Sequence, residues 1–328
     1  MYGKPQPLIG QSRFERTSCM LPPASQPLFD SSEGDEDDSP ICVMSFNVAD
    51  PSGAGGLSAD QIAITASGGH ALPVTTGILV RDTSTIFDLI ELDADAVEEQ
   101  ARTVLEDMDV EVFKVGFAGS PEALAVIAEI TADYEEIPVI TQVTPLSWWE
   151  RDKIEAYLDA LTELILPQTS VLVGNYDLLW RWLLPEWSSD KRPGPRDIAA
   201  AAAQHGVPYV VITSANVQVE STETIAASPE SLVATVSLDR YEANFVGAGD
   251  TFSATLATLL ASGDELAEAV REASIYVNRS LLAAFQPGMG AAIPDRMFWA
   301  QVEGEDGDEE LAQDEADVLG IPPTATRH

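Results

Sequence analysis

The chain has 328 residues, 45% of them hydrophobic, which is enough to build one large α/β domain or two small ones. Its 54 acidic residues against 17 basic ones give a formal net charge of -37. We therefore expect neither a nucleic-acid partner nor an anionic membrane surface, because both are bound by clustered Lys and Arg. The two cysteines, Cys19 and Cys42, are too few for a disulfide framework, and three histidines make a His/Cys metal site a poor explanation of the chain.

Two polar stretches bound the central region. Residues 1–40 carry Pro, Ser and Gln followed by an acidic run, and residues 301–328 are again rich in Glu and Asp. We predict both as disordered acidic tails outside one domain at 41–300. Solubility of the tails and adaptation of the whole surface to high salt both explain the acidity. The start lacks the apolar segment of a signal peptide and no apolar run could span a bilayer, so a cytoplasmic protein is expected.

Between the tails, strand-like and helix-like segments alternate. Alternation of this kind predicts a three-layer α/β/α fold with a central, mostly parallel sheet. In such sheets the ligand binds outside the carboxyl ends of the strands. In chain order we predict a strand at 41–46, a helix at 54–67, a strand at 73–80, a helix at 94–108, a strand at 110–115, a helix at 121–134, a strand at 138–143, a helix at 154–166, a strand at 170–173, a helix at 196–205, a strand at 208–213, an antiparallel pair at 217–228 and 232–238, and helices at 248–260 and 265–284.

The run FVGAGDTFSA at 245–254 places small residues directly before an apolar helix. Small residues let the backbone approach a ligand, and the free N–H groups of a helix start favour an anion. Asp250 would there take the proton of an attacking hydroxyl, while the helix end stabilises a transferred phosphoryl group. The same residues would also make a simple capped turn, so the run alone leaves both interpretations open.

This run resembles the signature of the ribokinase-like kinases, and it is not a Walker A loop, because no Lys follows. The resemblance implies that Asp250 is the catalytic base and that the backbone of Gly247, Ala248 and Gly249 forms an anion hole. It also implies a ribokinase-like fold, ATP and Mg²⁺ as cofactors, a small-molecule substrate and assembly as a homodimer.

A second motif, ADPSGAGGLSAD at 49–60, follows the first predicted strand. Asp50 would point from the sheet edge into the ligand crevice, where a carboxylate accepts hydrogen bonds from an aminopyrimidine or a hydroxymethyl group. Taken alone, an Asx-turn or a helix cap is the simpler explanation of this residue.

Together with the segments at 68–83, 110–122 and 164–175, the second motif resembles hydroxymethylpyrimidine and phosphomethylpyrimidine kinase, the thiamin-pathway branch of the superfamily. The resemblance spans 41–300, with order and spacing preserved. It implies substrate contacts at Asp50, Gly53, Arg81 and Phe117. It implies an ATP or metal region at Asn175, Thr213 and Ser214.

Several positions depart from the pattern of that family. Arg81 stands where a Gln contacts the pyrimidine, and Phe117 stands where a Met packs on it. The acidic DPVM segment is replaced by TQVT at 141–144, and Leu178 replaces a Glu that helps to organise Mg²⁺. The candidates for the missing carboxylate are Glu150, Glu163 and Asp177.

Three functions remain open from the sequence. We expect ATP-dependent phosphorylation of 4-amino-5-hydroxymethyl-2-methylpyrimidine and/or its monophosphate in thiamin biosynthesis. A pyridoxal or pyridoxine kinase is the alternative enzyme, favoured by Asp250, where thiamin-pathway members usually carry Cys, and by VVITS at 210–214. A catalytically degenerate pyrimidine- or nucleotide-binding protein is the alternative of another class, although retention of both Asp50 and Asp250 favours an enzyme.

Overall fold

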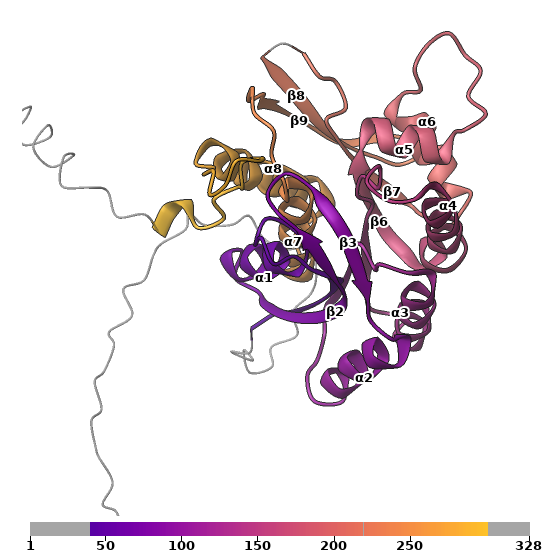
Figure 1. Ribbon diagram of the computed structural model, residues 1–328. Helices are drawn as coiled ribbons and strands as arrows, with labels where there is room; N and C mark the ends of the chain where they lie inside the picture. The colour runs from indigo at the N-terminus through magenta and orange to yellow at the C-terminus, as the bar shows by residue number, and fades with distance from the viewer. Residues whose placement is uncertain (1–39, 219, 301–328) are drawn as a thin grey trace, which may run out of the picture. The chain divides into compact units, whose positions relative to one another are not determined.

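The computed structural model describes residues 40–218 and 220–300 (Figure 1). The tails predicted at 1–40 and 301–328 lie outside the described residues, apart from Pro40. In the described part of the chain, no helix is both long enough and apolar enough to cross a membrane.

Strands and helices alternate along the described chain, as predicted. The elements are, in order, β1 (Cys42–Ala49), α1 (Gly56–Ala66), β2 (His70–Arg81), β3 (Ile86–Glu91), α2 (Ala94–Leu105), β4 (Val112–Val115), α3 (Pro121–Asp133), β5 (Val139–Gln142), α4 (Arg151–Ala160), η1 (Leu161–Ile165), η2 (Leu166–Gln168), β6 (Thr169–Asn175), α5 (Tyr176–Leu183), α6 (Pro195–Ala203), β7 (Tyr209–Thr213), β8 (Ser221–Ala227), β9 (Leu232–Asp239), α7 (Ala248–Ala261), α8 (Leu266–Leu282) and η3 (Phe298–Ala300).

The strands of the described residues form one nine-stranded sheet in the order β3-β2-β1-β4-β5-β6-β7-β8-β9. Neighbours from β2 through to β7 run parallel, whereas β3, β8 and β9 are antiparallel to their neighbours. The mostly parallel sheet and the antiparallel pair near its end are therefore confirmed. The edge strand β3 was not predicted, because its sequence IFDLIE lacks the alternation of apolar and polar residues that indicates a strand.

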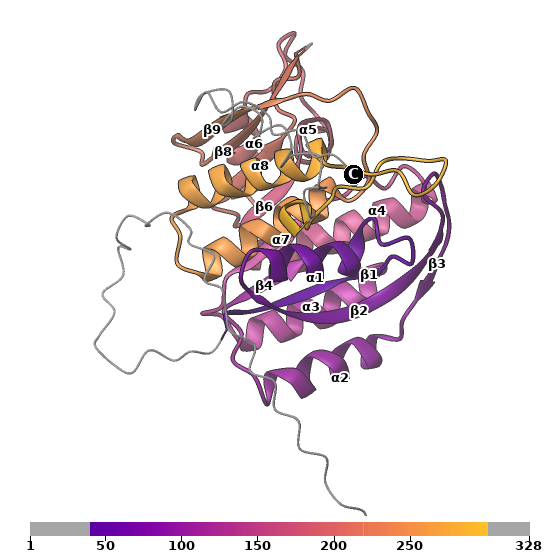
Figure 2. The same cartoon turned by 90° about the vertical axis from the view of Figure 1, so that its left-hand side faces the viewer.

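Helices cover both faces of this sheet (Figures 1 and 2). Side chains that alternate along a strand point to opposite faces, and the two apolar clusters follow this rule. Val43 and Val112 pack with Phe252 of α7 on one face, where α1 and α8 also lie. Met44 and Phe113 pack on the other face with the helices α2 to α6. The predicted three-layer arrangement is confirmed.

Polar side chains interrupt the apolar pattern on the face that carries α1 and α7. Ser45 and Asn47 share the orientation of Val43 on β1, and Lys114 shares that of Val112 on β4. All three are buried, with exposed fractions of 1%, 1% and 0%. Because buried polar groups need partners, these positions direct attention to what α1 and α7 place opposite them.

Candidate active site

A cavity of about 670 Å³ opens at the carboxyl ends of β1, β4, β5, β6 and β7. A volume of this size suits a small-molecule ligand, and its place agrees with the rule for parallel sheets. Gly53, one of the predicted site residues, does not line this cavity. The others do, namely Asp50, Arg81, Phe117, Asn175, Thr213, Ser214, Gly247, Ala248, Gly249 and Asp250.

Asp50 follows β1 directly, and its residue is 2% exposed. Its Oδ1 accepts hydrogen bonds from the backbone N–H and the hydroxyl of Ser52 at 2.9 and 2.6 Å. Its Oδ2 accepts from the N–H of Gly55 at 2.9 Å and lies 3.3 Å from Nη1 of Arg81. The turn that the sequence allowed is thus formed, and the same carboxylate lines the cavity.

Gly55 separates the two carboxylates of the cavity. A Cβ added to it would lie 3.0 Å from Oδ2 of Asp250 and 3.5 Å from Oδ2 of Asp50. Two residues that are 200 positions apart in the sequence, one from each motif, therefore face one narrow space.

The N-terminus of α7 opens toward the same space. Gly247 precedes it with a φ of 85°, a conformation that favours glycine. The first N–H groups of a helix have no acceptor within the helix, and here they include those of Ala248 and Gly249, which line the cavity. This backbone is arranged to bind an anion.

Asp250 lies in the first turn of α7, with its side chain 14% exposed. Its Oδ1 accepts a hydrogen bond from Nδ2 of Asn47 at 3.2 Å and lies 3.9 Å from Nζ of Lys114. Burial raises the pKa of Asp250 above its ordinary value of 3.8, and the Lys114 cation opposes this rise. A carboxylate with a raised pKa is a better proton acceptor than an exposed one.

Arg296 ties the two motifs together from the C-terminal side. Only 4% exposed, it donates from Nη2 to the carbonyl of Ala54 at 2.5 Å and of Gly247 at 3.4 Å, and from Nη1 to that of Gly53 at 3.4 Å. Its Nε donates to the hydroxyl of Thr251 at 2.8 Å. Desolvation lowers the pKa of this guanidinium, and the carboxylate of Asp250 is the largest cause that opposes the shift. Gly53 thus contributes its carbonyl to the scaffold.

An aromatic wall stands at another side of the cavity. Phe117 and Trp148 both line it, with their rings edge to face at 5.9 Å. Trp149 and Tyr157 hold Phe117 from behind at 5.3 and 5.2 Å. Aromatic rings on one side of a cavity can pack against a planar ligand ring, face to face or edge to face.

The ends of β6 and β7 carry the polar residues predicted to meet phosphates. Asn175 caps α5, because its Oδ1 accepts from the N–H of Leu178 at 2.8 Å. Thr213 ends β7, and Ser214 follows with a φ of 53°, which is rare for a residue other than glycine. Backbone strain of this kind gathers at functional sites.

Carboxylates that could hold a metal ion are scarce around the cavity. The part of the chain that the structure describes contains no group of three or more His, Cys, Asp or Glu side chains that could hold a metal ion. Glu150, Glu163 and Asp177 do not line the cavity, whereas Asp50 and Asp250 do. The described residues thus offer no built set of metal ligands, so that Mg²⁺ would have to be held mainly by phosphate oxygens and water.

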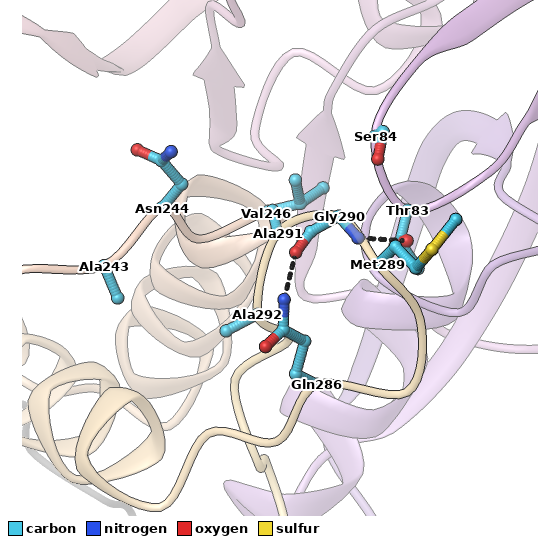
Figure 3. A pocket seen from close by; sticks show the side chains of 10 residues that line it. All are labelled: Thr83, Ser84, Ala243, Asn244, Val246, Gln286, Met289, Gly290, Ala291 and Ala292. Carbon is cyan, nitrogen blue, oxygen red and sulfur yellow. Dashed lines mark hydrogen bonds between the residues drawn. The ribbon is translucent and has the colours of Figure 1, made fainter.

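A second hollow of about 550 Å³ shares Ser84 and Val246 with the first (Figure 3). Its lining residues come from the β2–β3 turn, from the loop before α7 and from the loop after α8 at 286–292, which is called the late loop below. Thr83 fastens that late loop, because its hydroxyl accepts from the N–H of Gly290 at 3.1 Å and its carbonyl accepts from the N–H of Ala291 at 3.0 Å. The residues lining it are all uncharged.

The family model described as "Phosphomethylpyrimidine kinase" matches residues 50–295. The chain belongs to this family. A hydroxymethylpyrimidine/phosphomethylpyrimidine kinase of Streptomyces coelicolor is 26% identical over 262 residues, covering 80% of this chain and 96% of the relative. One of Rhizobium meliloti is 25% identical, covering 74% and 91%. The predicted kinase family is confirmed.

Solved structures share the fold of this phosphomethylpyrimidine kinase family member. The pyridoxal kinase of Staphylococcus aureus in complex with pyridoxal has a TM-score of 0.70 at 19% identity, covering 81% of this chain and 96% of its own. A phosphomethylpyrimidine kinase of Clostridium difficile has a TM-score of 0.60 at 22% identity, covering 74% and 99%. These likenesses confirm the ribokinase-like α/β fold.

Sequence reasoning did not single out several residues that surround Asp250. Lys114 lies inside the segment at 110–122 that resembles the family, and Asp60 inside the motif at 49–60, yet neither carries a predicted role. Asn47 and Arg296 carry no local motif at all. A usable signal for Lys114 was its position between three apolar residues of a four-residue strand, where a charge needs a partner.

Proposed function

We propose that this protein transfers the γ-phosphoryl group of ATP to 4-amino-5-hydroxymethyl-2-methylpyrimidine and/or to its monophosphate, in thiamin biosynthesis. Family membership and the activity for which the relatives are named support this choice of substrate. The observation that carries the proposal is the pairing of Asp250 with the open N-terminus of α7 in one cavity.

In the first transfer, Asp250 accepts the proton of the hydroxymethyl group. The oxygen forms a bond to the γ-phosphorus, the bond to the bridging β–γ oxygen breaks, and ADP leaves with that electron pair. The N–H groups of Gly247, Ala248 and Gly249 stabilise the charge on the transferred group. In a second transfer the acceptor is a phosphate oxygen that is already ionised, so Asp250 orients it and no longer removes a proton.

The other side of the cavity would hold the substrate ring. Asp50 can accept hydrogen bonds from the amino group, and Phe117 offers its face or edge to the pyrimidine. Arg81 donates only, so it cannot reproduce the donor-acceptor pair of an amide, and it contributes a positive charge beside Asp50. Gly53 supports this end through its turn rather than by contact.

Asn175, Thr213 and Ser214 would meet the phosphates of ATP. A Mg²⁺ ion bound to those phosphates would neutralise part of their charge. The positions of these three residues beside α7 in one cavity support this assignment. Beyond the site, we propose that residues 41–300 form one domain and that the protein works in the cytoplasm. We also propose that it forms a homodimer, and light scattering of the purified protein tests this oligomeric state.

A pyridoxal or pyridoxine kinase is the second candidate. Asp250 in a GAGD context and the fold likeness to a structure with bound pyridoxal favour it. Both candidates use the same base and the same anion hole, so only the ring and its contacts with Asp50, Arg81 and Phe117 separate them.

The test is ADP formation by the purified protein in high salt with Mg²⁺, with the pyrimidine, its monophosphate and pyridoxal offered separately. D250N is measured in parallel, and D88N, which changes an exposed Asp on β3, is the matched control. We expect turnover of the pyrimidine or its monophosphate that D250N loses and D88N keeps. Turnover of pyridoxal alone would select the second candidate, and nucleotide binding without turnover of any acceptor would indicate a binding protein.

A further inference from the structure

Lys114 is a fully buried cation in the middle of the sheet. Its side chain is 0% exposed, and it points from β4 toward the face covered by α1 and α7. Its Nζ lies 2.7 Å from Oδ1 of Asp60, whose side chain is also 0% exposed. Burying two charges is costly, and apolar residues of similar volume can often replace a buried ion pair without loss of stability. The buried pair therefore calls for an explanation other than filling space.

The pair does not stand alone, because it reaches Asp250 by two routes. The Nζ of Lys114 lies 3.9 Å from Oδ1 of Asp250. The Nδ2 of Asn47 donates to Oδ2 of Asp60 at 2.9 Å and to Oδ1 of Asp250 at 3.2 Å. Asn47 is itself held, since its Oδ1 accepts from the N–H groups of Val48 and Phe117 at 2.9 and 3.2 Å.

We propose that Lys114 is a positioning residue which, together with Asp60 and Asn47, holds Asp250 as an oriented carboxylate ready to accept a proton. This inference rests on the proposed function, in which Asp250 is the base. Lys114 touches no substrate in this scheme and acts only through Asp250.

The charges that face Asp250 come from every element packed around it. Lys114 on β4 and Arg296 on the C-terminal segment lower the pKa of Asp250, whereas Asp60 on α1 raises it. Across Gly55 lies Asp50, which is paired with Arg81. Burial is the largest cause and raises the pKa of Asp250, and the cation of Lys114 is the largest influence that opposes this rise.

This arrangement makes a prediction of opposite sign for the two members of the buried pair. Removing the cation in K114M leaves Asp60 and burial acting on Asp250, which raises its pKa. Removing the anion in D60N leaves Lys114 unopposed, which lowers it. A pair that does not act on Asp250 would give losses of stability without shifts of opposite sign in its pKa.

The experiment is the pH dependence of kcat for the variants K114M, D60N and K114R. Because the base must be ionised, kcat falls as the pH drops through the pKa of Asp250. The acidic limb is the part of the profile where kcat falls as the pH drops. We expect its midpoint to move to higher pH by about one unit or more in K114M and to lower pH in D60N, in line with the effect of a charge at this distance. K114R should restore the limb of the original protein, and K153M, which breaks an exposed pair with Glu91 of the same 3.9 Å length, should leave it unchanged. Shifts of the same sign, or none, in folded D60N and K114M would overturn the inference.

Two further measurements keep the inference testable. If K114M does not fold, D60N and the double variant K114M/D60N decide it, because a limb that does not move down in D60N overturns it. If no acceptor is turned over, the proposed function fails, and the carboxyl of Asp250 is then titrated by carbon-13 NMR, with D250N to identify its signal. The same opposite shifts in that titration support the role of Lys114, and their absence overturns it.

Discussion

Gly247 packs against Ala54 so closely that a Cβ on the glycine would stand 1.6 Å from the carbonyl oxygen of Ala54. Ala54 belongs to the motif at 49–60 and Gly247 to the motif at 245–254. The same Arg296 side chain binds both carbonyl groups. The anion-binding end of α7 is therefore built on the loop that carries Asp50, and the two motifs form one unit.

The variant G247A tests this contact. Its added methyl would overlap the Ala54 carbonyl, so we expect loss of folded protein or of nearly all activity. G263A is the matched control, because Gly263 has a φ of 87° against 85° at Gly247, yet a Cβ added to it would meet nothing within 4 Å. It should cost only the roughly 1–2 kcal/mol of a left-handed backbone. Equal losses in the two variants, read from thermal melts and ADP formation, would contradict the packing argument.

The variant D250N is expected to lower kcat by roughly 10²- to 10⁴-fold, the usual contribution of a positioned base. It is also expected to stabilise the protein at neutral pH. Burial raises the pKa of Asp250 in the folded state. Ionisation of this carboxylate therefore disfavours folding at pH values above 3.8, the ordinary pKa of the group.

The gain in melting temperature of D250N should therefore grow as the pH rises from acid to neutral. It should vanish below pH 3.8, where the group is protonated in both the folded and the unfolded chain. Melting curves of both proteins across this range measure it. A variant that is less stable than the original at neutral pH would contradict the direction of the pKa shift.

The variant R296K removes the fork that joins three carbonyl groups and one hydroxyl. Lysine keeps the charge but cannot span these acceptors, so we expect a lower melting temperature and a fall in kcat larger than the change in KM. R271K, at a half-exposed residue paired with Glu268 on α8, is the control and should change neither. A harmless R296K would show that charge alone is enough at this position.

Salt is expected to stabilise the protein strongly. The net charge of -37 makes like charges repel, and the screening length falls from about 8 Å at physiological ionic strength to about 3 Å at 1 M. The melting temperature should rise with KCl and level off near that concentration. A neutral osmolyte at equal osmolarity controls for effects other than screening, and an equal rise in the osmolyte would argue against adaptation to salt.

Much of the architecture could be predicted from local patterns. The central strands are short apolar runs because the sheet buries both of their faces, and the helices between them are long enough to show a period. The short helix α5 was missed, since its eight residues YDLLWRWL are fewer than the roughly 11 over which helical periodicity is read, and its start depends on the cap by Asn175. The helix predicted at 154–166 instead begins at Arg151 and changes to a π-helical turn at Leu161.

The sequence by itself determined the family, the parallel sheet and the two carboxylates that lie in glycine-containing motifs, Asp50 and Asp250. Such signals are short-ranged, because glycine and small residues mark places where the backbone must turn or approach a ligand. Only the tertiary structure decided that both carboxylates face Gly55 and that Lys114 and Asp60 lie next to Asp250. These contacts join residues on separate elements, so they depend on strand order and on how α1 and α7 pack on the sheet, which no local pattern encodes.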